Sequence, residues 1–422
     1  MTISAPLARR LGFLDAVTIG LASMIGAGVF VAFAPAAESA GSWLLAGLGI
    51  AAIVALCNAL STAQLATAYP TAGGAYLYGR ERLGEWPGFL AGWGFVVGKT
   101  ASCAAIALAF AAYVAPEGWE RAIAVAATLV LATVNSLGIT RTSAVARLIV
   151  VFVIAVLAIV VVAGLASSSS PTPSGATSAP LLPDSPDALG ILQSAGLLFF
   201  AFAGFARVAT LGEEVRDPAR TIPRAILTSL GIVLLLYGLL SVALLSVLGA
   251  QATAGADAPL SELVKVSGWA WAAPLVIAAA AVATLGSLLA LLAGVSRTTL
   301  AMARHDDLPR GLAVVNARVS TPVRAELLIA GIVSILVLTV DLREVIGFSS
   351  FGVLLYYLVA NASAFTQSQT DRRYPRAVSA IGALSCTLLV VTLPWQSIAA
   401  GIVVLLAGVA YRLLRTRWML RR

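Results

Sequence analysis

The sequence predicts an all-α polytopic membrane protein. Of its 422 residues, 60% are hydrophobic and only 11% are charged, whereas about a quarter of the residues in a soluble domain are charged. The mean hydropathy is +0.96. Apolar stretches of roughly the 20 residues that a helix needs to cross a bilayer recur along the whole chain. These observations exclude an ordinary soluble protein.

Twelve apolar stretches are predicted to be transmembrane helices, and together they form a single membrane domain over residues 1–422. The longest polar stretch, residues 167–187, is rich in Ser and Pro and lacks Lys and Arg, which indicates an external loop. The predicted spans lie near residues 13–35, 43–68, 87–114, 121–139, 145–167, 188–212, 225–250, 270–302, 325–340, 345–366, 377–393 and 396–414.

The positive charges predict the orientation, because cationic loops remain on the cytoplasmic side. With both termini in the cytoplasm, all but five of the 27 Lys and Arg residues fall in cytoplasmic segments. Arg121, Lys265 and Arg343 fall outside, and Lys99 and Arg207 fall within or near spans. We therefore expect a multi-pass protein of the inner (cytoplasmic) membrane. Its net charge of +8 indicates contact with anionic lipid headgroups and no nucleic-acid partner.

The sequence lacks the usual groups of an enzyme or a metal site. Cys57, Cys103 and Cys386 lie in different predicted spans at unrelated spacings, and the single His305 lies in a charged loop. No phosphate-binding loop is present. We expect no enzymatic activity, no metal and no cofactor.

Two predicted spans are interrupted by small residues where a membrane helix should be most regular. The first contains Gly26 and Gly28, and the sixth contains Ala203 and Gly204. Small residues can simply allow close helix packing. However, paired interruptions in corresponding parts of two halves are also typical of inverted-repeat transporters, which bind substrate between the broken helices.

Several motifs together resemble the amino acid–polyamine–organocation (APC) superfamily, in particular its bacterial amino acid permeases. The resemblance implies a LeuT-type fold of five plus five helices in an inverted repeat, with two extra C-terminal helices. The first repeat would cover about residues 13–167, the second about 188–366, and the extra helices about 377–414. The motifs are 23–30, 69–76 with 83–86, 213–218 with 222–223, and 301–304 with 307–309.

This resemblance and the helix breaks suggest how an amino acid would bind. Backbone N–H groups of Gly26, Ala27 and Gly28 at a half-helix N-terminus suit a carboxylate. Freed carbonyl groups suit the ammonium group, and the candidates are Met24, Ile25, Phe200, Phe202 and Ala203. Phe200 also matches the position of an aromatic gate in related transporters, with Phe202 as the competing candidate and simple packing as the alternative.

Lys99 lies well inside the third predicted span, where a charge is costly unless it is paired or neutralised. It is a candidate proton carrier, or a fixed positive charge in place of a coupling cation. The alternative is a lysine that snorkels to the interface. Some relatives have such a lysine in the fifth span, but residues 148–153 here contain none. We expect coupling to the proton gradient and no sodium site.

The polar residues after the second break bear on the substrate. Ala206 stands where relatives commonly have a carboxylate, which favours neutral amino acids over cationic ones. Arg207 would pair with Glu213 or Glu214, or else bind an acidic side chain. The two glutamates would belong to an inner gate or proton path, or anchor a solvated loop.

These features predict a secondary active transporter that works by alternating access and takes up neutral amino acids with protons. An amino acid or amine exchanger and a non-transporting amino acid sensor are the alternatives. The partners are the amino acid substrate and the lipid bilayer, and both a monomer and a homodimer remain open. A channel is disfavoured because the spans show isolated polar residues and no continuous polar lining.

Overall fold

The computed structural model describes residues 11–26, 28–69, 73–137, 143–168, 187–209, 214–316, 319 and 321–420. Within them the regular structure consists of helices and two isolated β-bridges. The α-helices are α1 Phe13–Ile25, α2 Gly28–Val31, α3 Phe33–Ala40, α4 Leu44–Ala68, α5 Gly74–Leu83, α6 Glu85–Val114, α7 Glu120–Ser136, α8 Ser143–Ser168, α9 Ala188–Phe202, α10 Ala206–Ala209, α11 Pro218–Val247, α12 Gly249–Gly255, α13 Pro259–Val266, α14 Ala273–Arg304, α15 Val323–Thr339, α16 Leu342–Phe365, α17 Arg376–Thr392 and α18 Trp395–Leu420. Short 3₁₀ helices are η1 Gly41–Trp43, η2 Ala203–Phe205, η3 Ala270–Ala272 and η4 Arg310–Ala313.

Nine helical segments of these described residues are long and apolar enough to cross a membrane. They are Phe13–Val31, Phe33–Ala68, Glu85–Val114, Val145–Ser167, Ala188–Ala209, Pro218–Val247, Ala270–Arg304, Leu342–Phe365 and Trp395–Thr416. The chain is therefore a polytopic helical membrane protein, as predicted.

Three further helices coincide with predicted spans but are shorter. α7, α15 and α17 have 17 residues each. At 1.5 Å per residue such a helix is about 25 Å long, which is at the lower limit for crossing a bilayer. Their length keeps these three helices out of the nine segments, and that they cross the membrane stays a prediction.

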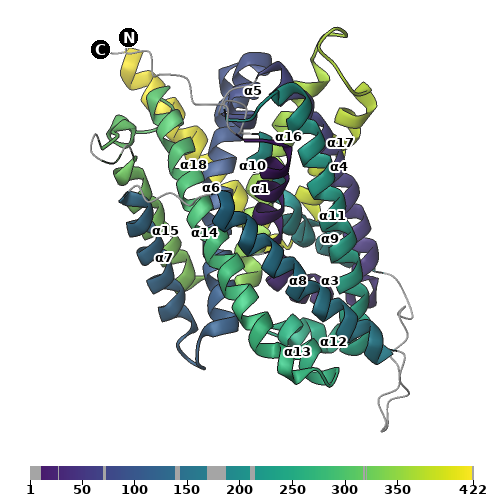
Figure 1. Cartoon of the computed structure of the whole chain (residues 1–422). Helices are drawn as coiled ribbons and strands as arrows, with labels where there is room; N and C mark the ends of the chain where they lie inside the picture. The colour runs from purple at the N-terminus through teal and green to yellow at the C-terminus, as the bar shows by residue number, and fades with distance from the viewer. Residues whose placement is uncertain are drawn as a thin grey trace.

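The helices form an elongated bundle (Figure 1). α5 lies at one end, which we call the terminal end because α18 also finishes there, and α12 and α13 lie at the opposite end. The broken helices α1 and α9 lie inside the bundle, where most of their side chains are buried. The breaks are thereby kept away from the surface that faces lipid.

A glycine-lined crossing of α6 and α16 determines where Lys99 lies. A Cβ added at Gly98 would come within 3.0 Å of the Ser349 carbonyl oxygen, and one added at Gly352 within 2.6 Å of the Gly94 carbonyl oxygen. Small residues allow such close approach of membrane helices. The hydroxyl oxygens of Ser102 and Ser349 also lie 2.6 Å apart across this contact. Lys99 is thus carried by a closely packed and fully buried part of α6.

Asp307 is the centre of a buried ion-pair network at the terminal end. Its carboxylate accepts hydrogen bonds from Tyr76 at 2.7 Å and Arg80 at 2.8 Å, and Arg412 lies 2.9 Å away. Arg412 on α18 also lies over the ring of Phe89, 4.7 Å from its centroid. Burial, together with the bond to Asp307, raises the pKa of Tyr76 well above its usual range. This network ties α18 to α5, to α6 and to the segment after α14.

We predict that Asp307→Asn lowers the free energy of unfolding by about 3–5 kcal/mol, because Arg412 and the partly buried Arg80 would lose their buried partner and keep the exposed carboxylate of Glu85. Thermal unfolding of purified protein in detergent measures this. Asp341→Asn is the control: its pair with Arg121 is exposed and should contribute less than about 1 kcal/mol. Equal stability losses in the two variants would contradict the prediction.

Candidate functional site

The first helix break lies between α1 and α2, at the glycines that the sequence singled out. α1 ends at Ile25, and α2 begins at Gly28. Gly26 is buried between them, and Ala27 lies outside the described residues. α2 and α3 form one helical run, because the Ala32 N–H donates to the Gly28 carbonyl at 2.9 Å and the Ala36 N–H to that of Ala32 at 3.3 Å.

The second break lies between α9 and α10. α9 ends at Phe202, the chain tightens into the 3₁₀ turn η2, and α10 begins at Ala206. A 3₁₀ turn changes the i→i−4 pattern of backbone hydrogen bonding. It therefore changes the direction of carbonyl groups that would form hydrogen bonds within a continuous helix.

The two breaks are in direct contact through their glycines. A Cβ added at Gly28 would come within 2.3 Å of the Ala201 Cα, and one added at Gly204 within 2.2 Å of the Ser23 carbonyl oxygen. In each case a glycine of one broken helix packs against the backbone of the other. Both positions therefore exclude a side chain, and the two interrupted spans form one structural unit.

Tyr237 on α11 joins the carbonyl groups of the two broken helices. Its hydroxyl lies 2.7 Å from the Met24 carbonyl oxygen and 3.3 Å from that of Ala201. The ring is fully buried and packs against Phe33 and Phe202, with ring centroids 6.0 and 5.3 Å away. A hydroxyl has one proton to donate, so these two acceptors share it and retain unused lone pairs.

Lys99 reaches the second break. Its Nζ donates to the Ala203 carbonyl oxygen at 3.4 Å, and the Tyr357 hydroxyl donates to the same oxygen at 3.3 Å. The Lys99 side chain is 8% exposed, and it forms no ion pair with any described residue. Its ammonium therefore points into the bundle, which does not agree with the snorkelling alternative.

Ser287 on α14 packs against the first break. Its hydroxyl donates to the Ala22 carbonyl oxygen at 3.2 Å, and a Cβ added at Gly26 would overlap the Ser287 Oγ at 1.5 Å. A polar side chain of another helix thus occupies the space that the glycine leaves open.

The candidate carbonyl and aromatic residues differ in their surroundings. Met24 and Ala203 accept hydrogen bonds from side chains of other helices, whereas Ile25 is described only as buried. Phe202 is fully buried against Tyr237, and Phe200 is half-buried at the edge of the core. Which aromatic residue closes over a substrate stays a prediction.

The charged candidates after the second break lie near the start of α1. Arg207 on α10 interacts electrostatically with Glu214 and with Arg297 of α14. The Leu11 N–H donates to the Glu214 carbonyl at 3.0 Å, within a parallel bridge between Leu11 and Val215. Glu213 lies outside the described residues. The segments before the first break and after the second are thus tied together.

Three polar residues of this site were missed by sequence reasoning: Tyr237, Ser287 and Tyr357. Tyr237 stands alone among apolar residues, Ser287 follows Thr284 by three positions, and Tyr357 directly follows Tyr356; a polar residue within an apolar helix was the available signal. Met24, Ala22 and Ala203 lie 154 to 265 positions from their partners in sequence, and Ala201, the second partner of Tyr237, lies 36 positions away. These contacts cannot be read from one sequence, so the sequence does not distinguish the three residues from other buried hydroxyl residues.

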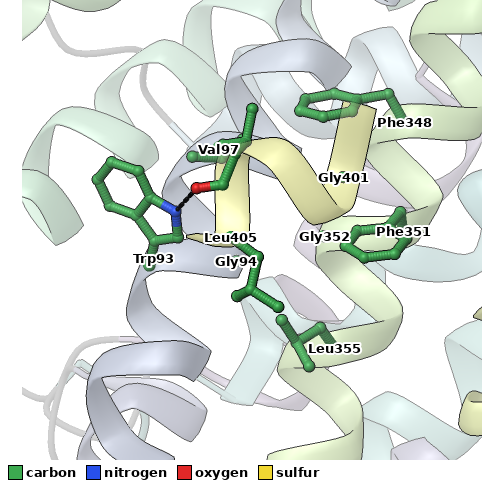
Figure 2. A pocket seen from close by; sticks show the side chains of 10 residues that line it. Trp93, Gly94, Val97, Phe348, Phe351, Gly352, Leu355, Gly401 and Leu405 are labelled. Atoms are coloured by element: carbon green, nitrogen blue, oxygen red, sulfur yellow. Dashed lines mark hydrogen bonds between the residues drawn. The ribbon is translucent and has the colours of Figure 1, made fainter. Parts of the chain in front are cut away.

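An apolar hollow lies elsewhere, between α6, α16 and α18 (Figure 2). Trp93 lies at its edge, and its indole N–H donates to the Val404 carbonyl oxygen at 2.9 Å. Phe348, Phe351 and Leu355 supply much of its lining. None of its lining residues belongs to either helix break, so the hollow is separate from the candidate site.

Comparisons with known proteins identify the family of this chain. Residues 11–411 match the family described as amino acid permease. An uncharacterized transporter of Mycobacterium tuberculosis is 56% identical over 96% of this chain and 90% of its own length. Cationic amino acid transporter 7 of Arabidopsis thaliana is 29% identical over 93% of this chain and 72% of its own length. The branched-chain amino acid permease BcaP of Bacillus subtilis is 26% identical over 97% of this chain and 94% of its own length. The chain belongs to the amino acid permease family of the APC superfamily and is a transporter, not an enzyme.

Proposed function

We propose that this transporter carries neutral amino acids into the cell by alternating access, driven by the proton gradient. The observation that carries the proposal is the contact between the two broken helices. There, carbonyl groups of both helices meet side chains of α6, α11 and α16 in the interior of the bundle. Such discontinuous helices provide the substrate and ion sites of inverted-repeat transporters.

The proposed architecture is the five-plus-five inverted repeat with two additional helices. α7, α15 and α17 complete twelve spans together with the nine longer segments. The two broken spans, α1–α2 and α9–α10, are the first helices of the repeats near residues 13–167 and 188–366. Their mutual contact at Gly28 and Gly204 supports a common centre between the two repeats.

The backbone groups at the breaks would bind the parts that all amino acids share. The N–H groups of Gly26, Ala27 and Gly28 would bind the carboxylate, since the start of a helix carries favourable dipole charge. The carbonyl groups of Met24 and Ala203 would accept hydrogen bonds from the ammonium. The hydroxyl groups of Tyr237 and Tyr357 occupy these acceptors, and the substrate ammonium would compete with them.

The substrate side chain is proposed to be neutral. In the described part of the chain, no Asp or Glu side chain forms a hydrogen bond or ion pair with the residues of either break, and Lys99 adds a positive charge beside them. A cationic side chain would lack a counter-charge there. Among the relatives, the permease of Bacillus subtilis is named for branched-chain amino acids and the transporters of Arabidopsis for cationic ones, so the choice of a neutral side chain rests on the charges at the breaks.

Proton coupling is proposed to involve Lys99. A sodium ion bound near its ammonium would be repelled at short range, whereas a buried lysine can gain and lose a proton. The inner gate would lie at the segments joined by the Leu11–Val215 bridge, with Arg207, Glu213 and Glu214 beside it. We expect this gate and both termini to lie in the cytoplasm, because cationic segments favour that side.

A substrate panel in proteoliposomes tests the proposed function. Labelled leucine, alanine, arginine and glutamate are supplied with and without an imposed pH gradient. Leucine or alanine should accumulate at least tenfold more than arginine or glutamate, and only with the gradient. Flux that requires amino acid inside would identify an exchanger, and binding without flux a sensor. Preferred uptake of arginine would contradict the neutral substrate.

The contact between the breaks gives a second prediction. Gly28→Ala should reduce uptake at least tenfold, because the added Cβ would come within 2.3 Å of the backbone of Ala201. Initial uptake rates are compared for equal amounts of protein that elute as a single folded species. Gly294→Ala is the control, since a Cβ there meets nothing within 4 Å. Normal uptake by Gly28→Ala would show that transport does not need this close approach.

A third prediction concerns Lys99. Lys99→Met should reduce uptake driven by a pH gradient at least tenfold, because methionine cannot carry a proton or donate to the Ala203 carbonyl. Lys265→Met replaces the other lysine of the chain, which is exposed on α13, and should leave uptake unchanged. If Lys99→Met retains proton-coupled uptake, Lys99 has a structural role only.

A further inference from the structure

Glu326 is a buried carboxyl group outside the candidate site. It lies in the first turn of α15 and is 2% exposed. The Ser296 hydroxyl on α14 donates to its Oε2 at 3.1 Å, whereas Oε1 forms no hydrogen bond with a described residue. Asn135 on α7 lies beside the carboxyl group, but its amide nitrogen donates to the Leu289 carbonyl oxygen at 2.9 Å.

A buried, ionised carboxylate needs more hydrogen-bond donors than Glu326 has. Both oxygens of the anion accept hydrogen bonds, and burial without an ion pair is unfavourable. Glu326 has one hydrogen bond and no ion pair among the described residues. A carboxyl group that carries its own proton fits these surroundings better.

Glu326 lies at about the same depth in the helix bundle as Lys99. α6 begins and α14 ends in one cluster that includes Phe89 and Met302, so these packed helices run in opposite directions. A Cβ at Gly92 would lie 2.8 Å from the Met302 sulfur. Since both helices rise about 1.5 Å per residue, Ser296 lies about level with the residue before Lys99. Cys103, one turn after Lys99, lies near both Lys99 and Glu326.

Every helix packed against α15 contributes to these surroundings. The charged or titratable neighbour on α14 is Arg297 and that on α6 is Cys103, while α7 contributes Asn135 and η4 carries Arg310, which is exposed and paired with Asp306. On α15 itself, Arg324 is two residues away and exposed. Glu326 is the acidic residue of this group, and the neighbouring positive charges would favour loss of its proton once water reaches it.

We infer that Glu326 is a second protonation site of this transporter, separate from the helix breaks. The carboxylate takes up one proton on its oxygen from the side of higher proton concentration and releases the same proton on the other side. No other bond forms or breaks. The inference rests on the proposed proton-coupled transport.

The test compares Glu326→Gln with Glu344→Gln, which removes an exposed carboxylate from the first turn of α16. Proteoliposomes are assayed with labelled leucine, or with the panel member that the wild-type protein exchanges fastest. Two fluxes are measured: uptake driven by a pH gradient, and exchange of labelled for unlabelled amino acid at equal pH. Glu326→Gln should lower driven uptake at least tenfold and leave exchange within twofold. Glu344→Gln should change neither.

Infrared difference spectra provide a readout that does not depend on transport. In wild-type protein, acidification from an alkaline pH at which Glu326 has lost its proton should produce a protonated carboxyl band that is absent in Glu326→Gln and present in Lys99→Met and Glu344→Gln. If the wild-type protein exchanges amino acids but does not respond to the pH gradient, the proposal of proton-coupled uptake is wrong. Loss of the carboxyl band in Glu326→Gln, and not in the other two variants, would in that case still support the protonation site. An unchanged band in Glu326→Gln, normal driven uptake, or equal loss of both fluxes would overturn the inference.

Discussion

The structure depends on one constraint: backbone groups released by a broken helix must find partners where water is scarce. Each unsatisfied backbone group inside a membrane costs several kcal/mol. At the breaks, Tyr237 supplies a donor for the Met24 and Ala201 carbonyls, and Lys99 and Tyr357 supply donors for the Ala203 carbonyl. Side chains of three unbroken helices thereby compensate for two interrupted ones, and these same contacts define the candidate site.

Close backbone contact is the second consequence of this arrangement. Gly28 packs against Ala201, and Gly204 packs against Ser23, so the centre of the site consists mainly of main chain. Main-chain N–H and carbonyl groups suit the carboxylate and ammonium that all amino acids share. Selectivity among amino acids must then come from surrounding side chains, among which the positive charge of Lys99 is prominent.

The charges of the molecule separate into a network at one end and isolated groups in the interior. At the terminal end, Asp307 is held by Tyr76, Arg80 and Arg412, so opposite charges are closely paired. In the interior, Lys99 and Glu326 each have a single hydrogen bond among the described residues. A network with several mutually supporting bonds resists movement, whereas an isolated group can change its proton or its partner at little structural cost.

The sequence by itself determined that the chain is a helical membrane protein, and it located both helix breaks and the unusual lysine, because apolar length, small residues and a buried charge are local properties of the chain. Helix ends were less predictable: α11 begins at Pro218 instead of near residue 225, because apolarity marks depth in the membrane and not the end of a helix. Tertiary structure alone decided that Lys99 reaches Ala203, that Tyr237 joins Met24 to Ala201, and that Ser296 holds Glu326. These contacts join different helices, and several join residues more than 100 positions apart, so they depend on how the helices pack, which the local pattern of one sequence does not contain.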